Sequence, residues 1–403
     1  MKRKVSALLV AGVLASLAAA PGVANAQVSD DVVKIGVLND MSGLYADIAG
    51  PGSVLAAQMA VEDFGKSLKV EIVSADHQNK PDVGASIARQ WYDRENVDVI
   101  LDTTTSSVAL AVSEVTKEKK KIFIPSGGGT SDLTGKSCSP YTAHWTYDTY
   151  SNAHTVGSAL VKKGGDSWYF VTADYLFGHS IERDVGQVVT AAGGKVLGSA
   201  RHPLNTSDFS SYLLQAQASK AKIIGLANAG GDTINSIKQA SEFGITQSGQ
   251  NLAGLLVFLT DVHGLGLQIA QGLILTETFY WDLNDSTRAW TKRFVEKSGG
   301  KYPTMVHAGV YGAVLHYLKA VEAGKTDDGT KTIAKMKEMP TDDPLFGKGT
   351  IRADGRKIHP AYLFEVKKPA ESKGPYDYYK LRTTIPADQA FRPLAEGNCP
   401  LVK

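Results

Sequence analysis

Three short segments rich in hydroxyl side chains and glycine could together bind an anion. They are residues 39–43 (NDMSG), 103–107 (TTTSS) and 126–130 (SGGGT), and each follows a run of apolar residues. Hydroxyl groups and unpaired backbone N–H groups at a helix start hydrogen-bond a carboxylate, and the helix dipole favours its charge. Helix capping by Ser and Thr and turning by Gly are the alternative explanation for each segment. If the three segments meet, we expect them to form a carboxylate site.

Signatures of catalysis are largely missing from the chain. It has no HExxH pair, no GxSxG elbow and no GxGxxG loop after a strand. The residues Gly135-Lys136-Ser137 resemble the end of a phosphate-binding loop, but the preceding glycine, Gly129, lies one residue too far away. The histidines do not form the close clusters expected of zinc ligands, and Asp174 has no evident nucleophile or partner carboxylate. We therefore expect no enzyme, no metal and no cofactor.

The charge balance argues against a nucleic-acid partner. The 403 residues include 43 Lys and Arg against 41 Asp and Glu, and no stripe of basic residues runs along the chain. Binding to nucleic acid needs such a stripe to neutralise phosphates. With 43% hydrophobic and 21% charged residues, the composition is that of an ordinary globular protein.

The N-terminus has the pattern of a secretory signal peptide. Residues 2–4 are basic, an apolar run extends to Ala20, and small residues at 24 and 26 form a cleavage site. A membrane anchor is the alternative, but the apolar run is shorter than the roughly 20 residues that span a bilayer. We expect cleavage after Ala26 and an exported, mature chain that starts at Gln27.

Export affects the interpretation of the two cysteines, Cys138 and Cys399. An oxidising compartment permits a disulfide between them, and two separate buried thiols are the alternative. A bridge would fix the C-terminal tail to a loop near the middle of the chain. It would be structural, since no residue nearby suggests redox chemistry.

The body of the chain alternates strand and helix patterns in two series, which predicts two doubly wound α/β lobes with parallel sheets. Apolar, β-branched runs predict strands at residues 32–39, 70–75, 97–103 and 122–124 in the first series, and at 168–172, 195–200, 223–227 and 252–258 in the second. Helical patterns follow Pro51, Pro81 and Ser106, and later cover 154–163 and begin near 178, 209 and 233. Helices at 288–298 and 306–323 and strands at 361–366 and 378–384 complete the lobes, with a turn-rich crossover at 345–360.

Several of these segments resemble one family of transport proteins. Residues 33–37 (VKIGV) and 41–43 (MSG) look like the opening of the periplasmic solute-binding proteins of bacterial ABC importers, specifically the branched-chain amino-acid (leucine/isoleucine/valine-binding-like) type. The similarity continues in order through residues 56–63, 105–107, 133–134, 177–178, 205–209 and 238–240, and covers essentially the whole mature chain.

The resemblance implies the type I periplasmic binding protein fold, in which two Rossmann-like lobes joined by three hinge strands close on a ligand. Lobe 1 would comprise residues 27–147 plus 282–359, and lobe 2 residues 148–281 plus 360–403. Such proteins deliver a small molecule to a cognate ABC permease in the inner membrane and catalyse nothing. We therefore expect a periplasmic location and a monomer.

The resemblance also implies the residues of the ligand site, position by position. Thr105 matches the family serine that holds the ligand carboxylate, and Ser106 follows it. Backbone donors after the fourth strand fall near Ser126 and Gly127. One family aromatic over the ligand corresponds to Phe177, with Tyr175 close by. Another falls near Ile48, and Tyr45 is expected to take over its role. Ordinary packing is the alternative for the three aromatic residues.

Two family positions carry a different residue type here. A family tyrosine falls near Ala229, and the glutamate that pairs with an amino acid's α-ammonium falls at Leu256, among apolar neighbours. A buried ammonium there would lose its hydration without a charge partner, at a cost of several kcal/mol, unless Asp261 or Asp174 compensates. We therefore expect a small carboxylate without an α-amino group, and the aromatic side chains favour an aromatic acid. An amino-acid-binding protein of the same family, a ligand-sensing receptor module and an exported α/β enzyme are the alternatives.

Overall fold

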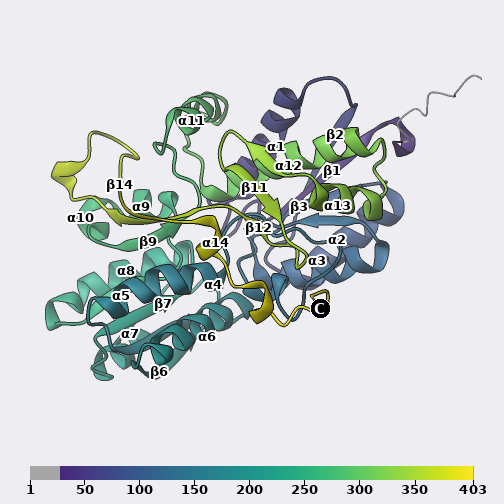
Figure 1. Cartoon of the computed structure of the whole chain (residues 1–403). Helices are drawn as coiled ribbons and strands as arrows, with labels where there is room; N and C mark the ends of the chain where they lie inside the picture. The colour runs from purple at the N-terminus through teal and green to yellow at the C-terminus, as the bar shows by residue number, and fades with distance from the viewer. Residues whose placement is uncertain (1–27, 403) are drawn as a thin grey trace, which may run out of the picture.

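Two parallel four-stranded sheets organise the chain, each flanked by helices (Figure 1). The structure is a computed structural model that describes residues 28–402, so the expected signal peptide lies outside the described residues. The two-lobed α/β fold expected from the alternating pattern is confirmed.

The first sheet has the strand order β2-β1-β3-β4. Its central strands are apolar runs that helices bury from both faces, as parallel strands require. Its members are β1 (Val33–Asn39), β2 (Val70–Asp76), β3 (Val99–Asp102) and β4 (Ile122–Ile124). A proline in the first turn begins both α1 (Gly50–Phe64) and α2 (Pro81–Arg94), because the N–H that proline lacks is unpaired there in any case. The third helix, α3 (Ser106–Lys119), starts at the carboxyl edge of the sheet.

The second sheet repeats this arrangement with the order β6-β5-β7-β8. Its strands are β5 (Ser167–Ala173), β6 (Lys195–His202), β7 (Ile223–Ala227) and β8 (Asn251–Gly254). The helices between them are α6 (Leu176–Ala191), α7 (Ser210–Ala218) and α8 (Gly231–Glu242). The carboxyl ends of both sheets therefore carry helix starts, which is where open α/β sheets bind ligands.

Two expected elements of this lobe differ in the structure. The strand expected at 252–258 ends at Gly254, and residues 255–258 form a buried loop that leads into α9 (Leu259–Leu265). Residues 255–258 are apolar and buried, as the residues of a buried strand would be. The apolar pattern alone therefore does not distinguish this buried loop from a strand. The helix expected at 154–163 begins five residues earlier, since Asp148 caps α4 (Thr149–Asn152), and a π-turn then connects it to α5 (Ser158–Lys162).

Elements from the last third of the chain complete both lobes. Helices α11 (Asp285–Lys297) and α12 (Met305–Gly324) pack on α1, and nearly every residue of α12 is buried. A third sheet, of order β14-β13-β9, joins β9 (Ile274–Glu277), β13 (Ala361–Val366) and β14 (Tyr379–Ile385). The sequence patterns missed α10 (Leu267–Ala270), α13 (Gly329–Glu338) and β9. They also missed a small antiparallel sheet of β10 (Thr341–Asp343), β11 (Gly347–Ile351) and β12 (Lys357–Ile358), which lies partly in the expected crossover.

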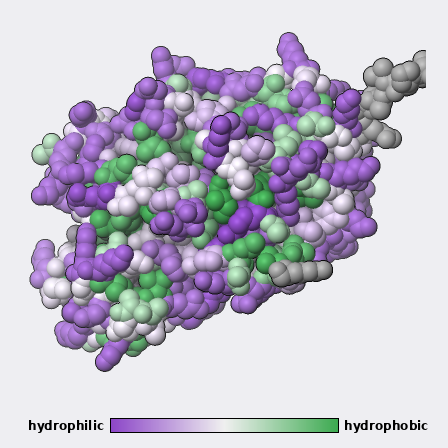
Figure 2. All heavy atoms as spheres, viewed as in Figure 1, coloured by the Kyte–Doolittle hydropathy of each residue, from purple (hydrophilic) through white to green (hydrophobic). Residues whose placement is uncertain are grey.

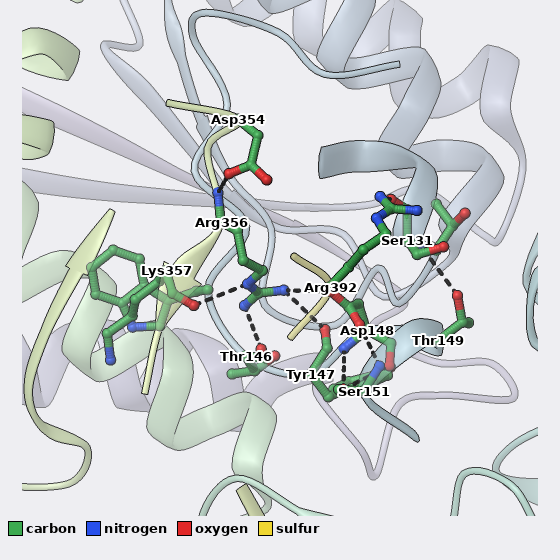
Figure 3. A network of polar contacts seen from close by, with 12 residues as sticks. Ser131, Thr146, Tyr147, Asp148, Thr149, Ser151, Asp354, Arg356, Lys357 and Arg392 are labelled. Carbon is green, nitrogen blue, oxygen red and sulfur yellow. Dashed lines mark hydrogen bonds and ion pairs between the residues drawn. The ribbon is translucent and has the colours of Figure 1, made fainter. Parts of the chain in front are cut away.

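A buried arginine and a disulfide fasten the segments between the lobes. Arg356 donates to the backbone oxygens of residues 146 and 147 and lies 3.4 Å from Asp148, so it ties two chain crossovers together (Figure 3). The bridge between Cys138 and Cys399 is confirmed, with their Cα atoms 5.6 Å apart. It brings the tail beyond α14 (Ala387–Ala390) back to the loop that follows β4.

Figure 2 shows one face that is mostly hydrophilic, with apolar patches among the polar residues. Among residues 28–402, no helix is both long enough and apolar enough to cross a bilayer.

Candidate ligand site

The carboxyl ends of the two sheets face each other across a small void. Loops after strands of both sheets line it, and its lining residues are Tyr45, Ile48, Thr104, Tyr147, Tyr175, Phe177, Ala229, Leu256 and Phe258. The structure thus brings five predicted site residues together, namely Tyr45, Tyr175, Phe177, Ala229 and Leu256. The void has a volume of about 10 Å³, which is room for about one water molecule. The two lobes are therefore closed around this point.

A pair of tyrosine hydroxyls bridges the void. The hydroxyls of Tyr45, from the loop after β1, and Tyr175, from the loop after β5, lie 2.8 Å apart. Burial raises the pKa of both phenols, so both remain protonated at neutral pH. The two hydroxyl groups have one proton each, and only one of these protons forms the hydrogen bond between the two oxygens. The other hydroxyl can therefore donate its proton to an acceptor on a ligand.

A double-mutant cycle on this pair tests whether the lobes are closed without ligand. We expect Tyr45→Phe to lower the free energy of unfolding by about 1–3 kcal/mol, because it leaves the Tyr175 hydroxyl buried without a partner. Removing both hydroxyls together should cost less than the two single substitutions summed, which gives a coupling energy of about 1 kcal/mol. Tyr92→Phe, which removes a buried hydroxyl bonded to the Ile122 carbonyl, is the control. A coupling energy near zero would contradict the closed arrangement.

The hydroxyls at the start of α3 are already engaged within the protein. Thr105 donates its hydroxyl to Asn79 Oδ1, and Ser106 Oγ accepts the backbone N–H of Thr130 at 3.1 Å. Neither residue lines the void, whereas Thr104, one position earlier, does. The ligand-binding roles of Thr105 and Ser106 therefore stay predictions, and Thr104 joins them as a candidate.

The two candidates after β4 differ from one another. The backbone N–H of Gly127 donates to the carboxylate of Asp102 at 2.9 Å, so an internal anion occupies the donor that was expected to bind the ligand. The hydroxyl of Ser126 is buried and has no hydrogen-bond partner within the described residues. Neither residue lines the void, and their contact with a ligand remains a prediction.

Sequence reasoning missed two residues that line the void, Tyr147 and Phe258. Ile48 also lines the void, and the Tyr147 hydroxyl donates to the Gly127 carbonyl at 2.6 Å. A Cβ atom at Gly129 would lie 2.6 Å from a ring carbon of Tyr147, so the missing side chain makes room for that ring. Tyr147 and Phe258 lie outside the polar strand ends that the sequence drew attention to, and no local pattern marks them.

A much larger cavity, of about 890 Å³, lies between the lobes next to the void, and Ile48 lines both. Its walls include Leu44 and Leu55 on one side and Ile234 and Asp261 on the other. The interface between the two lobes therefore contains a large cavity in addition to the small void.

The two acidic residues that could have paired with an α-ammonium do not line the void. Asp261 lines the larger cavity, and burial raises its pKa to about 7. Asp174 is exposed, and its carboxylate lies within hydrogen-bond distance of His179 Nε2, at 2.9 Å. Glu277 is buried with one carboxyl oxygen that has no hydrogen-bond partner among the described residues, and burial raises its pKa. The side chains that line the void therefore include no carboxylate. Among residues 28–402, no group of acidic, His and Cys side chains is placed to hold a metal ion.

Asp261 should make stability depend on pH. Burial raises its pKa from 3.8 to about 7, so the folded protein binds this proton more tightly than the unfolded chain does. Binding of this proton therefore stabilises the folded protein at low pH, and this contribution to the free energy of unfolding is lost as the pH rises from about 4 to about 7. We expect Asp261→Asn, which keeps an acceptor for the Phe258 N–H, to raise the free energy of unfolding at pH 8 by about 2–4 kcal/mol. Urea unfolding at pH 5 should show a smaller increase in the free energy of unfolding for this variant. An unchanged free energy of unfolding at pH 8 would contradict the expectation.

Comparison with known proteins identifies the family. A profile of the periplasmic binding protein family matches residues 32–374, so the chain belongs to that family. A periplasmic binding protein from Burkholderia mallei is 52% identical, with 93% of this chain and 100% of that chain covered and a TM-score of 0.91. A branched-chain amino acid ABC transporter periplasmic ligand-binding protein from Burkholderia xenovorans LB400 is 43% identical, with 92% and 100% covered and a TM-score of 0.82. A search of curated proteins found no match.

More distant relatives share the fold and hold aromatic acids. A solute binding protein of an ABC transporter from Rhodopseudomonas palustris HaA2, in complex with p-hydroxybenzoic acid, is 25% identical, with 89% and 98% of the two chains covered and a TM-score of 0.79.

Family membership makes this protein the periplasmic substrate-binding component of an ABC transporter, of the branched-chain amino-acid binding type. Its relatives are solute-binding proteins rather than enzymes, so the expected absence of catalysis agrees with the family. The family implies a periplasmic location, whereas the cleavage site and the monomeric state stay predictions.

Proposed function

We propose that this protein captures a small carboxylate without an α-amino group, an aromatic acid of the benzoate type, and delivers it to an inner-membrane permease. The observation that carries the proposal is the void lined by Tyr45, Tyr147, Tyr175, Phe177 and Phe258 but by no acidic side chain. Aromatic rings favour offset or edge-on contact with a ligand ring. An α-ammonium would find no charge partner among them.

Relatives of the same fold support this ligand class. Solute binding proteins from Rhodopseudomonas palustris hold benzoate, 3,4-dihydroxybenzoic acid and 4-hydroxybenzoate, at 21–25% identity to this chain. The free phenolic O–H of the Tyr45–Tyr175 pair offers a donor to a ring hydroxyl or a carboxylate. A branched-chain amino acid is the second candidate, favoured by the description of the 43% identical relative.

Ligand entry requires the lobes to separate. A void of about 10 Å³ has no room for an aromatic ring, so the aromatic side chains must move apart when the ligand binds. The division into lobe 1 (residues 27–147 plus 282–359) and lobe 2 (residues 148–281 plus 360–403) is part of this proposal. The tail returns to the first lobe through Cys399.

A thermal-shift panel tests the ligand class. Benzoate, 4-hydroxybenzoate, 3,4-dihydroxybenzoate and cinnamate are compared with leucine, isoleucine and valine. A ligand at about 100 times its Kd adds roughly 2.7 kcal/mol of stability, so at least one aromatic acid should raise the Tm while the amino acids leave it unchanged. A shift with leucine and none with the acids would replace this proposal with the amino-acid receptor.

Leu256→Glu tests why the amino group is excluded. It places a carboxylate at the position that the family resemblance matches to the glutamate of amino-acid receptors, so it should weaken binding of the best aromatic acid at least tenfold by charge repulsion. Leu256→Gln has the same size without the charge and is the matched control. Equal affinities of the two variants would show that charge at this position does not select the ligand.

A further inference from the structure

A fully buried carboxylate, Asp102, lies at the end of β3 and holds three separate segments together. It accepts hydrogen bonds from Asn39 Nδ2 at 2.7 Å, from Ser53 Oγ at 2.5 Å and from the Gly127 N–H at 2.9 Å. These donors come from the end of β1, from α1 and from the loop after β4. Uncharged groups rather than a cation therefore stabilise its charge.

The same cluster reaches two residues that line the ligand void. Asn39 bonds Asp102 with its amide nitrogen and accepts the hydroxyl and the backbone N–H of Thr104 with its amide oxygen. The carbonyl of Gly127 accepts the hydroxyl of Tyr147 at 2.6 Å. Asp102 is thus linked to two sides of the void, to Thr104 and to Tyr147, through one intermediate residue each.

The backbone at Asp102 adopts an unusual conformation. Asp102 has φ 74° and the next residue, Thr103, has φ 59°. Non-glycine residues rarely enter this left-handed region, and a β-branched residue there is a clear outlier. Such strain persists only where surrounding contacts impose it, and it clusters at ligand sites. Here the hydrogen bonds to Asp102 hold the turn that leads directly into Thr104.

We propose that Asp102 is a positioning residue of the ligand site, whose ionised form holds Thr104 and the Gly127 loop in the binding arrangement. The proposal rests on the proposed function only for the choice of probe. An ionised carboxylate accepts all three hydrogen bonds, whereas a protonated carboxyl must itself donate and so loses one of them. Burial raises the pKa of Asp102 to about 6, against the opposing effect of the three hydrogen bonds.

Three other titratable groups lie near the cluster: Tyr147, His307 and Asp40. Burial raises the pKa of Tyr147, so its phenol stays protonated. Burial lowers the pKa of His307, which packs against α1 next to Ser53, to about 4. Asp40 follows Asn39 and donates its backbone N–H to Asn39 Oδ1 at 3.1 Å, while its carboxylate accepts the backbone N–H groups of residues 43 and 45.

The first arm of the test needs no ligand. The amide proton resonance of Gly127, followed by NMR from pH 4.5 to 8, should titrate with a midpoint near 6 as its acceptor is protonated. Ser53→Ala removes one donor to the ionised form, so the midpoint should move to higher pH. A Gly127 resonance that does not titrate, or a midpoint that Ser53→Ala leaves unchanged, would overturn the proposal.

The second arm measures affinity for 4-hydroxybenzoate by calorimetry. The affinity should fall at least tenfold from pH 7.5 to pH 5, and Asp102→Asn should bind at least tenfold more weakly at pH 7.5 and show no such pH dependence. Asp98→Asn, a buried carboxyl at the opposite end of the same strand that accepts the Lys34 N–H, is the control and should behave as wild type.

The two arms separate failure of this proposal from failure of the proposed function. An Asp102→Asn variant that binds like wild type with the same pH profile would overturn the positioning role. If 4-hydroxybenzoate does not bind to wild type at any pH, the proposed ligand class fails, and the Gly127 titration alone decides the role of Asp102.

Discussion

Arg356→Met is expected to lower the free energy of unfolding by about 3–5 kcal/mol, because it leaves a buried carboxylate without its cation. Arg356 is completely buried, and its guanidinium lies 3.4 Å from Asp148 and 4.4 Å from the centre of the Phe391 ring. Burial lowers its pKa to about 10, so it remains charged at neutral pH. The guanidinium also donates to the backbone of the crossover at residues 146–147, beside the void-lining Tyr147 (Figure 3).

Urea unfolding at pH 7 measures this loss. The matched control is Arg382→Met, which removes an exposed arginine from an ion pair with Glu365 at 2.7 Å and should cost less than about 1 kcal/mol. Arg356→Lys keeps the charge but not the forked geometry, so it should recover only part of the loss. An Arg356→Met protein that unfolds at the same urea concentration as the control would show that this buried pair does not fasten the crossovers.

The double substitution Cys138→Ser/Cys399→Ser should cost about 2–5 kcal/mol of stability. The bridge spans 261 positions of sequence, so it constrains a very long loop in the unfolded chain. It lies in the loop after β4 and in the tail, away from the residues that line the void. Affinity for the best ligand of the panel should therefore stay within about twofold of wild type.

Wild-type protein with and without reductant provides the control for this experiment. Under reducing conditions, the urea midpoint of wild type should fall to that of the double variant, while the variant itself should not respond. A loss below about 1 kcal/mol in both cases would contradict a stabilising role for the bridge.

Periodicity predicted the two parallel sheets well, because buried parallel strands such as β1 and β7 are continuous apolar runs with polar ends. It failed at residues 255–258, where the same apolar character belongs to a loop buried between the lobes. Short strands with polar sequences, such as β10, carry no such pattern and were missed.

The site was predicted in part, through the family resemblance rather than through periodicity. That resemblance implied Tyr45, Tyr175 and Phe177, and the structure gathers them around the void. Tyr147 was missed because it lies on a crossover, where no strand or helix period applies. The hydrogen bond from the Gly127 N–H to Asp102 forms because the end of β3 and the loop after β4 meet in space. The spacing of these residues in the sequence does not predict that contact.

The most direct test of the central claim is calorimetric titration of the ligand-free protein with 4-hydroxybenzoate and, separately, with L-leucine at pH 7.5. We expect a saturable heat with one site per chain for the aromatic acid and no binding heat for leucine, because the void offers aromatic rings but no acidic partner for an ammonium. Saturable binding of leucine together with none of 4-hydroxybenzoate would contradict the account.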